Sequence, residues 1–493
     1  MELKHSIPGN WDRDTDVIVV GYGAAGAATA ITAYDEGAEV LILEKAPEGE
    51  EGGNSRVAVG GWFTPTPVSR AISYFNALCG AYSVPEEMVK VWAEEMGENK
   101  DWVISLGGNP VKSRTGLAGA EFPELPGADC VHSYRQNGER GNEQLFKLLK
   151  TSVDKRGIKV LYATPGKELI ENCPTKEILG VRTEREGNQF NIKAKRAVVL
   201  TCGGFENNQE MVRDFLTNLP YCYPWGTPYN TGDGIKMAMA AGADLWHMNN
   251  IAGPWYALKV TEFPSVFMIR ALYYDKELPG GMILVGADGK RFINEKHKIA
   301  HGKVQVAGRW IQAPSPCPMF MVFDHTLFSA GPLYNKNDSE GWNAILKVYD
   351  WSDDNSAEMA RGWINKADTI EELAMRIKLN PAVLEDTANK WNKCCAVGKD
   401  TDFGRTVMLS PIGAKPFYAI EVSPAFINTQ GGPRRNGKGQ ILRPDGSPIR
   451  RLYSAGELGS IHSFLYQAAG NLGECLAFGR ISGRNAATEK PWD

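Results

Sequence analysis

Apolar runs and helical periodicities alternate along this chain in a regular order. Residues 17–20 and 40–43 are short apolar runs, each long enough for one buried strand, and a stretch rich in small residues lies between them. This order predicts a strand, a helix and a second strand, the βαβ unit of a parallel sheet. A third apolar run, at 196–200, predicts that the chain later returns to the same sheet.

The rest of the pattern predicts further elements on both sides of that return. Helical periodicity predicts helices over residues 85–106, 141–156, 235–241 and 470–487, with helical stretches near 355–395. Strand patterns mark residues 57–62, 158–162, 439–442 and 451–454, with a hairpin-like excursion at 167–190. Asp233 is expected to cap the helix that follows it.

The first two apolar runs enclose a glycine-rich turn. Gly21 permits the tight turn, Gly23 lets the backbone approach a pyrophosphate, and Gly26 allows close helix packing. The helix N-terminus supplies N–H donors and a partial positive charge for phosphates. Glu44 follows the second run at the spacing where a carboxylate bonds a ribose hydroxyl. The combination predicts dinucleotide binding in a Rossmann-like α/β domain.

Composition narrows the class of protein. The 493 residues include 43% hydrophobic and 23% charged positions with a net charge of −4, as in ordinary globular proteins. No basic block stands out, so nucleic acid is not an expected partner. No apolar run reaches the length of a membrane span and no signal segment is evident, so we expect a cytoplasmic protein. The nine cysteines lack haem, zinc or iron–sulfur spacing, so no metal site is expected.

Several segments, in order along nearly the whole chain, resemble the flavoprotein superfamily of fumarate reductase and succinate dehydrogenase, in particular its single-chain ketosteroid-dehydrogenase-like branch. Besides the glycine turn they are Gly52–Ser55, Val198–Phe205, Asn230–Gly234, Gly289–Glu295, Thr429–Gly432, Tyr453–Glu457 and Gly470–Gly473. The resemblance implies FAD in a glutathione-reductase-type Rossmann-like domain. It also implies an inserted α+β capping domain. We place the FAD-binding domain at 1–256 and 429–493, and the substrate or capping domain at 257–428.

The fingerprint and the resemblance together suggest the cofactor-binding residues. They are Gly21, Gly23, Ala25, Gly26, Glu44, Lys45, Gly53, Asn54, Ser55, Gly60, Gly61, Gly203, Gly204, Asp233, Gly456, Glu457, Asn471 and Leu472. Glu457 follows a strand and a glycine turn, where a carboxylate accepts from ribityl hydroxyls. The N-terminus of the 470–487 helix is expected to face the flavin N1/C2=O edge and stabilise the anionic hydroquinone. No histidine lies near Ser55, so the FAD is expected to be noncovalent.

The substrate side departs from the fumarate reductases. These proteins resemble one another in a histidine before Thr-x-Gly-Gly, an arginine beside the terminal Leu-Gly and a catalytic arginine after the Asn-Glu motif. Here those places hold Asn428, Asn471 and Ile299. A dicarboxylate without arginine clamps is poorly held, so fumarate and succinate are not expected substrates.

Tyr466-Gln-Ala-Ala-Gly470 resembles the Tyr-x-x-x-Gly segment of ketosteroid dehydrogenases. The resemblance implies that the Tyr466 phenol and the Gly470 amide hold a substrate ketone oxygen. Two such donors acidify the adjacent carbon and make a conjugated C=C bond a hydride acceptor. The simpler alternative for Tyr466 is a packed aromatic.

The proton-transfer partner is left open by the sequence. Phe122 replaces the tyrosine of the similar Tyr-Pro-Glu-x-Pro-Gly segment, and the basic tyrosine after the Asn-Glu motif is absent. The candidates are His297, Lys298, His301, Tyr273 and Tyr274, of which the histidines titrate nearest neutrality. Nearby aromatics suit either a flat polycyclic substrate or packing of the inserted domain; they are Trp255, Tyr256, Phe263, Phe267, Tyr273 and Tyr274.

We therefore expect an FAD-dependent oxidoreductase of a CH–CH or C=C unit in a steroid-like or flavonoid-like ketone or phenol. Reduction is favoured because the basic tyrosine is absent, and an external electron donor or acceptor is required. Alternatives are a ketosteroid desaturase, a tetrahydrodaidzein-type isoflavonoid reductase and a flavin electron-transfer subunit. A cinnamate or urocanate reductase would need Arg270, Arg434 or Arg435 to face the flavin.

Overall fold

The computed structural model describes residues 7–114, 119–273, 277–296 and 300–492. The chain divides into two compact units. The first comprises Met1–Thr217, Gly226–Ala252 and Asn428–Asp493, and the second comprises Asn218–Trp225 and Gly253–Ile427. Each unit has its own hydrophobic core and is described by itself.

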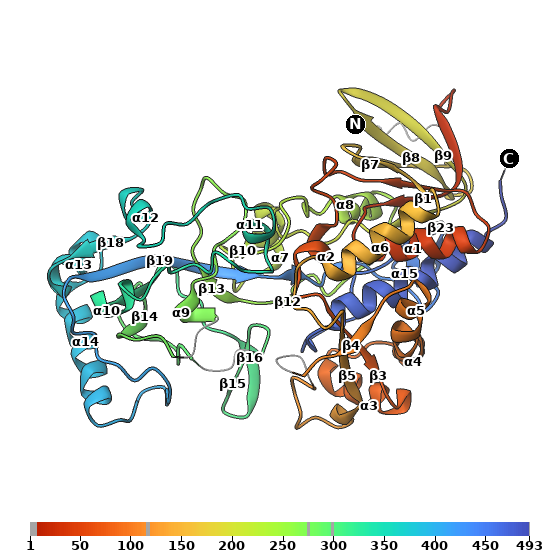
Figure 1. Ribbon diagram of the computed structural model, residues 1–493. Helices are drawn as coiled ribbons and strands as arrows, with labels where there is room; N and C mark the ends of the chain where they lie inside the picture. Colours follow the sequence, from red (N-terminus) through yellow and green to blue (C-terminus); the bar gives the residue numbers. More distant parts are fainter. Residues whose placement is uncertain (1–6, 115–118, 274–276, 297–299, 493) are drawn as a thin grey trace. The chain divides into compact units, whose positions relative to one another are not determined.

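An eight-stranded sheet forms the centre of the first unit (Figure 1). Its strands run in the order β22, β23, β9, β1, β2 and β6, and β7 and β8 extend it from β9. Their bounds are β1 (Arg13–Val20), β2 (Val40–Leu43), β6 (Lys159–Leu161), β7 (Gly166–Glu171), β8 (Ile178–Arg185), β9 (Asn188–Leu200), β22 (Gln440–Leu442) and β23 (Pro448–Ser454). The predicted βαβ unit is confirmed, because β1 pairs in parallel with β2 and with the returning β9.

The register of this sheet brings four strand ends to one level. Val20 is opposite Leu43 in β2 and Leu200 in β9, and Leu200 is opposite Ser454 in β23. Because these strands are parallel, the loops that follow them emerge at the same carboxyl edge, where α/β sheets bind ligands.

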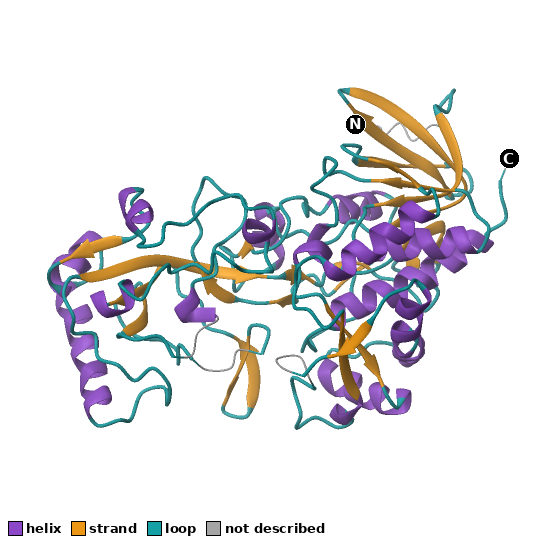
Figure 2. Cartoon of the chain, in the orientation of Figure 1, coloured by secondary structure: helices purple, strands orange, loops and turns teal. Residues whose placement is uncertain are grey.

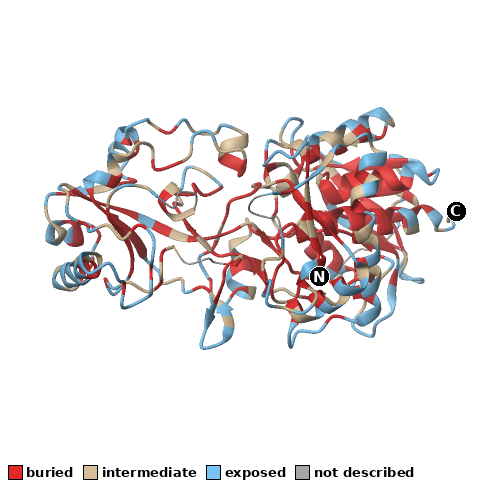
Figure 3. Ribbon diagram, turned by 60° about the horizontal axis from the view of Figure 1, so that its bottom comes forward, coloured by how far each residue is buried: buried red, intermediate tan, exposed pale blue. Residues whose placement is uncertain are grey.

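Helices cover this sheet and buried residues fill the layers between them (Figures 2 and 3). The helices of the first unit as a whole are α1 (Ala24–Asp35), α2 (Gly53–Val57), α3 (Val68–Cys79), α4 (Glu86–Gly97), α5 (Asn99–Ser105), α6 (Gln144–Lys155), α7 (Gln209–Phe215), α8 (Asp233–Ala240) and α15 (Gly470–Thr488). Of these, α1 and α15 pack directly on strands of the eight-stranded sheet. Helix α15 packs closely on α1: a Cβ at Gly479 would lie 2.6 Å from the Ala28 Cβ, and one at Gly483 would lie 2.5 Å from the Thr29 carbonyl oxygen. Small residues in both helices therefore permit the contact.

Smaller strands complete the first unit. They are the three-stranded sheet of β3 (Gly61–Pro65), β4 (Pro110–Lys112) and β5 (Val131–Gln136), and the pairs β11 (Leu245–Trp246) with β21 (Gly432–Pro433) and β12 (Ile251–Ala252) with β20 (Asn428–Thr429). Three local predictions were wrong. The periodicity over 85–106 is two helices that break at Glu98, the strand predicted from residue 57 begins at Gly61, and Gly232 rather than Asp233 is the N-cap of α8.

The second unit is built on a six-stranded, mostly antiparallel sheet with long loops (Figure 2). Its strands are β10 (Tyr223–Pro224), β13 (Trp255–Ala257), β14 (Met282–Gly286), β17 (Met319–Phe323), β18 (Asn365–Ala367) and β19 (Phe417–Phe426), and a separate hairpin joins β15 (Lys303–Val306) to β16 (Arg309–Gln312). Its helices are α9 (Arg270–Tyr273), α10 (His325–Phe328), α11 (Trp342–Ile345), α12 (Ser356–Ala360), α13 (Ile370–Arg376) and α14 (Pro381–Ala396). Both faces of β14, β17 and β19 are buried in apolar clusters.

Candidate FAD and substrate site

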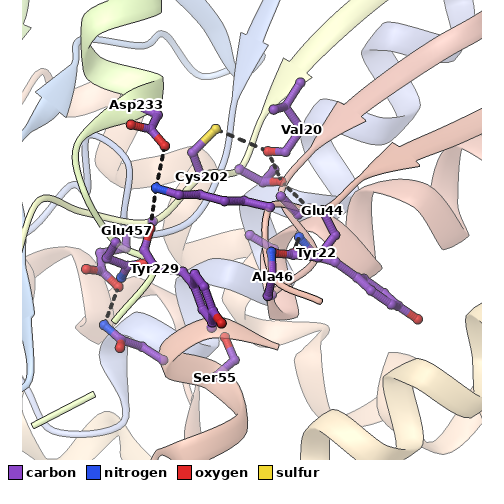
Figure 4. A pocket seen from close by; sticks show the side chains of 18 of the residues that line it. Val20, Tyr22, Glu44, Ala46, Ser55, Cys202, Tyr229, Asp233 and Glu457 are labelled. Atoms are coloured by element: carbon purple, nitrogen blue, oxygen red, sulfur yellow. Dashed lines mark hydrogen bonds and ion pairs between the residues drawn. The ribbon is translucent and has the colours of Figure 1, made fainter. Parts of the chain in front are cut away.

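A pocket opens at the carboxyl edge of the first unit's sheet (Figure 4), lined by the loops after β1, β2, β9 and β23. The turn after β1 requires glycine. Gly21 has a φ of +106°, and a Cβ at Gly26 would lie 2.0 Å from the Gly21 carbonyl oxygen. Gly23 is the N-cap of α1 and lacks a side chain to cap it, while Ser55 Oγ accepts from the Ala24 N–H at 3.0 Å. The helix N-terminus therefore lines the pocket as an anion site.

Glu44 lies at the end of β2, as its spacing predicted. Its side chain is buried and accepts from the backbone N–H groups of Tyr22 and Ala46, both at 2.7 Å (Figure 4). Burial raises the pKa of Glu44, and these two N–H donors oppose that shift. The two hydrogen bonds fix the carboxyl group beside the glycine turn, where a ribose hydroxyl is expected.

Lys45 and Asp233 form an ion pair across the pocket, with Nζ 2.7 Å from Oδ2 (Figure 4). Lys45 Nζ also donates to the Tyr229 carbonyl oxygen at 3.2 Å and contacts Thr231 Oγ1. Thr231 Oγ1 in turn donates to Asp233 Oδ1 at 2.9 Å. Asp233 therefore organises the pocket wall instead of capping α8.

Asn54 bridges two sides of the pocket. Its Nδ2 donates to Glu457 Oε2 at 3.3 Å, and its Oδ1 accepts from the Thr227 N–H at 3.0 Å. Glu457 lines the pocket beyond β23, and its Oε1 is buried with no donor among the described residues. Asn230, another lining residue, has a buried Nδ2 without an acceptor in the same part of the chain. Glu457 Oε1 is an acceptor and Asn230 Nδ2 is a donor, and a ligand bound in the pocket could form hydrogen bonds with both.

The pocket lining includes eleven of the predicted cofactor residues: Gly21, Gly23, Ala25, Glu44, Lys45, Gly53, Asn54, Ser55, Gly203, Asp233 and Glu457. The other predicted residues are not in the lining: Gly26, Gly60, Gly61, Gly204, Gly456, Asn471 and Leu472. Gly26 supports the turn, and a Cβ at Gly456 would lie 2.7 Å from the Ala25 Cβ, so these glycines act through close packing.

Sequence reasoning missed part of the lining. The missed side chains include Tyr22, Pro165, Thr201, Cys202, Tyr229, Asn230 and Cys475. Thr201 and Cys202 directly follow β9, and Asn230 begins the Asn230–Gly234 motif, so these positions carry a signal in the sequence. Cys475 lies on the second turn of α15 and has no such signal.

A second group of predicted residues gathers at the N-terminus of α15. Tyr466 Oη accepts from the Asn471 N–H at 3.0 Å, so the phenol lies at the first turn of the helix. Gly470 is packed between rings: a Cβ there would lie 2.6 Å from His462 Nε2 and 3.2 Å from Tyr466 Cε2. Burial raises the pKa of Tyr466, which keeps the phenol protonated. The structure thus brings Tyr466 and Gly470 together.

A buried network holds the segment that carries Tyr466 and Gly470. Gln467 is fully buried, and its Oε1 accepts from Tyr74 Oη at 2.6 Å and from the Glu121 N–H at 2.9 Å. Glu121 Oε2 accepts from the Ala468 N–H at 3.1 Å. Ala469 then takes a left-handed φ of +68° at the N-cap of α15, a conformation that costs energy for a residue with a Cβ. The network keeps that backbone in place.

A family model described as an FAD binding domain matches residues 16–472. The chain belongs to the FAD-binding flavoprotein family of fumarate reductase and succinate dehydrogenase. A probable fumarate reductase of Shewanella frigidimarina is 26% identical over 98% of this chain and 79% of its own length. The digoxin reductase of Eggerthella lenta is 26% identical over 98% of this chain and 89% of its own length.

Solved structures agree on the fold. The crystal structure of 3-ketosteroid Δ1-dehydrogenase from Sterolibacterium denitrificans has a TM-score of 0.76 and 22% identity, and the match covers 96% of this chain and 99% of that one. The predicted family and fold are therefore confirmed, and this flavoprotein is an FAD-dependent oxidoreductase that acts on CH–CH bonds. The phosphate-binding turn, Glu44 and the unsatisfied Glu457 Oε1 fit FAD, which supplies hydride chemistry when bound.

The flavoprotein carries neutral amides where the fumarate reductases have charged groups. Asn471 and Gln430 exchange two side-chain hydrogen bonds: Gln430 Nε2 donates to Asn471 Oδ1 at 3.2 Å, and Asn471 Nδ2 donates to Gln430 Oε1 at 3.1 Å. Asn428 is buried and donates to the Thr429 carbonyl oxygen at 3.0 Å. Ile299 lies outside the described residues. We call the Gln430–Asn471 pair the amide bridge.

Two of the arginines considered for a carboxylate substrate have other partners. Arg435 is buried, pairs with Glu474, and donates to the carbonyl oxygens of Leu458 at 3.0 Å and Gly456 at 3.2 Å. Arg434 pairs with Asp244 at 2.6 Å. In the second unit, Arg270 donates to the Pro332 carbonyl oxygen at 3.0 Å. Arg434 and Arg435 therefore form ion pairs within the first unit, which supports a structural role for both.

The remaining residues considered for proton transfer and substrate binding belong to the second unit. His301 packs edge-on against Trp255 at 5.3 Å between ring centroids, and Tyr273 packs against Trp255 at 6.3 Å. Tyr256 and Phe267 are buried in the unit's core, which supports packing rather than a substrate slot for these two rings. His297, Lys298 and Tyr274 lie outside the described residues.

The Gly289–Glu295 motif builds a buried charge network in the second unit. Arg291 forms paired hydrogen bonds with Glu295, both at 2.8 Å, and with Asp400 at 3.1 and 3.0 Å. Arg405 Nη1 lies 3.3 Å from Glu295 Oε2. Burial opposes ionisation of Asp400, but the Arg291 hydrogen bonds prevail and lower its pKa to about 2. The motif is therefore a structural element of this unit.

No group of three His, Cys, Asp or Glu side chains in the described ranges could hold a metal ion. Within the same residues, no helix combines the length and apolar character needed to cross a bilayer. All nine cysteines are free thiols.

Proposed function

We propose that this flavoprotein reduces a C=C bond conjugated to the carbonyl group of an uncharged polycyclic compound, a steroid-like or flavonoid-like ketone. The observation that carries the proposal is the pairing of Tyr466 with Gly470 at the N-terminus of α15. The neutral Tyr466 phenol is a donor for a carbonyl oxygen on which charge develops. The Gly470 N–H donates to the Gln467 carbonyl oxygen at 2.9 Å, so it would exchange that acceptor for the substrate oxygen. The 26% identical digoxin reductase supports a C=C reductase of this kind.

The donor strength of Tyr466 follows from its position. Its Oη accepts from the Asn471 N–H, and a hydroxyl that accepts a hydrogen bond donates a stronger one through its own proton. Tyr466 therefore polarises the substrate carbonyl and makes the β-carbon a better hydride acceptor, while the proton for the α-carbon comes from another acid. We propose His301 for that acid, because it is the one candidate histidine among the residues that the structure describes.

The preference for an uncharged substrate rests on the amide bridge. Asn471 and Gln430 offer hydrogen bonds but no positive charge, and Arg434 and Arg435 are engaged elsewhere. A carboxylate substrate needs a bidentate cation to offset its desolvation. We also propose that the FAD is noncovalent, since no histidine lies near Ser55; acid precipitation of the protein should release all of the flavin into the supernatant.

One experiment tests the proposal directly. The protein is reduced anaerobically with dithionite and mixed with a panel of polycyclic enones, phenolic ring compounds, cinnamates and fumarate, and flavin reoxidation is followed by absorbance. We expect fast reoxidation only with uncharged enones. Fast turnover of fumarate would contradict the proposal.

Tyr466→Phe sharpens this test. Loss of one oxyanion donor costs roughly 100-fold in turnover, with bound FAD unchanged. Tyr34→Phe, an exposed tyrosine in the same unit, is the matched control and should behave as wild type. Equal turnover of Tyr466→Phe and wild type would remove the proposed carbonyl-binding role.

A further inference from the structure

Two carboxyl groups, those of Glu206 and Glu457, meet beside the FAD pocket, and Glu457 belongs to the pocket lining. A Cβ at Gly204 would lie 2.6 Å from Glu457 Oε1 and 2.7 Å from Glu206 Oε1, so both side chains reach over the same glycine. Glu206 is 1% exposed. Glu206 Oε2 and Glu457 Oε1 are both buried without a donor from the described chain. We call these two residues the carboxyl pair.

Within the described ranges, the hydrogen-bond donors to the carboxyl pair are neutral groups. Glu206 Oε1 accepts from the Thr429 N–H at 2.8 Å and faces Thr429 Oγ1 at 3.4 Å. Glu457 Oε2 accepts from Asn54 Nδ2 at 3.3 Å. Arg435 donates to the backbone of this loop, but its charge is paired with Glu474. Two full negative charges would therefore repel each other in a buried place with neutral donors alone.

Other titratable groups around the pocket do not neutralise the pair. Cys475 on α15 is buried and Cys202 after β9 is half-buried. Desolvation raises the pKa of both thiols, so they stay neutral. Lys45 is paired with Asp233, and Glu44 is held by backbone donors at the other side of the pocket. Burial, together with the adjacent Glu206 carboxylate, raises the pKa of Glu457 well above its usual value.

We propose that Glu206 and Glu457 share one proton, and that this proton controls FAD binding. With the proton in place, one carboxyl group donates to the other and the pair carries a single negative charge. Glu457 can then accept from the ribityl hydroxyls that it is expected to bind. When the proton leaves at alkaline pH, a second charge appears in a pocket that also takes the anionic pyrophosphate, and FAD is released. Glu206 is thus a positioning residue whose proton sets the FAD affinity.

Glu206→Gln isolates the shared proton. A glutamine keeps an oxygen for the Thr429 N–H and offers an N–H to Glu457, so it reproduces the singly charged pair but cannot titrate. The FAD dissociation constant is measured between pH 6 and pH 10 by the fluorescence of released FAD. Above the apparent pKa of the pair, we expect the wild-type constant to rise about tenfold per pH unit. Glu206→Gln should bind FAD within about threefold of wild type near neutrality, and should lack the alkaline rise that the pair causes.

Glu44→Gln is the matched control, because Glu44 is also a buried carboxyl group in this pocket but lies outside the pair. It should weaken FAD binding at all pH values and keep the alkaline rise. A Glu206→Gln protein with the wild-type pH profile would overturn the proposal.

Infrared spectroscopy of the FAD-free protein gives a second readout. The shared proton predicts a carboxylic-acid C=O stretching band at neutral pH that disappears in Glu206→Gln and in alkaline wild type. The absence of this band from neutral wild type, or its persistence in Glu206→Gln, would also overturn the proposal. Neither measurement depends on the substrate, so a failure here is distinct from a failure of the proposed function.

Discussion

One cluster of charged side chains in each unit shows two different ways of treating charge inside the protein. In the second unit, Arg291 and Arg405 meet Glu295 and Asp400, so two cations balance two anions and each carboxylate is hydrogen-bonded. In the first unit, Glu206 and Glu457 face each other with neutral donors, and each has an oxygen without a donor from the described chain. Charges that satisfy one another stabilise a fold, whereas an incomplete set marks a place that a ligand completes.

The largest effect that this comparison predicts is in the second unit. Asp400→Asn leaves two buried arginines with one carboxylate, which should lower the free energy of unfolding by about 3–5 kcal/mol. Chemical denaturation measures the loss. Asp402→Asn, an exposed neighbour, is the control and should change stability by less than about 0.5 kcal/mol. A loss below about 1 kcal/mol for Asp400→Asn would show that the network is not a stabilising element.

Asp400→Asn should also change how the stability of the protein depends on pH. Because the Asp400 pKa is lowered to about 2 in the folded protein, its stabilisation is present above its unfolded value of about 4. That stabilisation is lost as the pH falls from about 4 towards 2. Acid unfolding of wild type should therefore be steeper over this range than acid unfolding of Asp400→Asn. Parallel acid profiles would contradict the assignment.

The next largest effect is expected in the first unit, where stability should fall as the pH rises. Because the Glu457 pKa is raised in the folded FAD-free protein, stability is lost as the pH rises through that folded value. Glu457→Gln should remove this alkaline loss without destabilising the FAD-free protein at neutral pH. It should also weaken FAD binding about 10- to 100-fold, since a charge-assisted hydrogen bond is worth about 1.5–3 kcal/mol. Thermal unfolding without FAD and FAD titration measure the two parts. If Glu457→Gln strongly destabilised the FAD-free protein, the Glu457 carboxylate would be needed for folding and not only for FAD binding.

A smaller effect is expected at the amide bridge. Asn471→Ala leaves the fully buried Gln430 amide without its partner, at a cost of about 1–2 kcal/mol. A double-mutant cycle with Gln430→Met should give a coupling energy of about 1 kcal/mol. The exposed Asn188→Ala is the control. Additive losses in the cycle would mean that the two amides do not act as a pair.

The smallest expected loss of stability is at Arg434, and it contrasts with the loss expected at the adjacent Arg435. Arg434 lies beside Asp244 with 40% of its side chain exposed, so Arg434→Gln should cost less than about 1 kcal/mol. That small cost should fall further in high salt. Arg435→Gln leaves Glu474 buried and unpaired and should cost several times more. Equal losses for the two variants would contradict this assignment of the first unit's charges.

Local chemistry in the sequence determined the nucleotide-binding core. Gly21 and Gly26 specify a turn that no other residue fits, and the apolar runs around them fix β1, α1 and β2, because these constraints act between near neighbours in the chain. The Tyr466-to-Gly470 spacing likewise lies within one segment, so the resemblance could assign both residues together.

Contacts between distant segments were decided by the tertiary structure alone. Glu206 meets Glu457 although the two residues lie far apart in the sequence, and no local pattern reports that approach. Arg434 and Arg435 are consecutive residues of the same type, yet Arg434 pairs with Asp244 and Arg435 pairs with Glu474. Burial and charge pairing are properties of the packed chain, so they became visible only when the strands and helices were placed together.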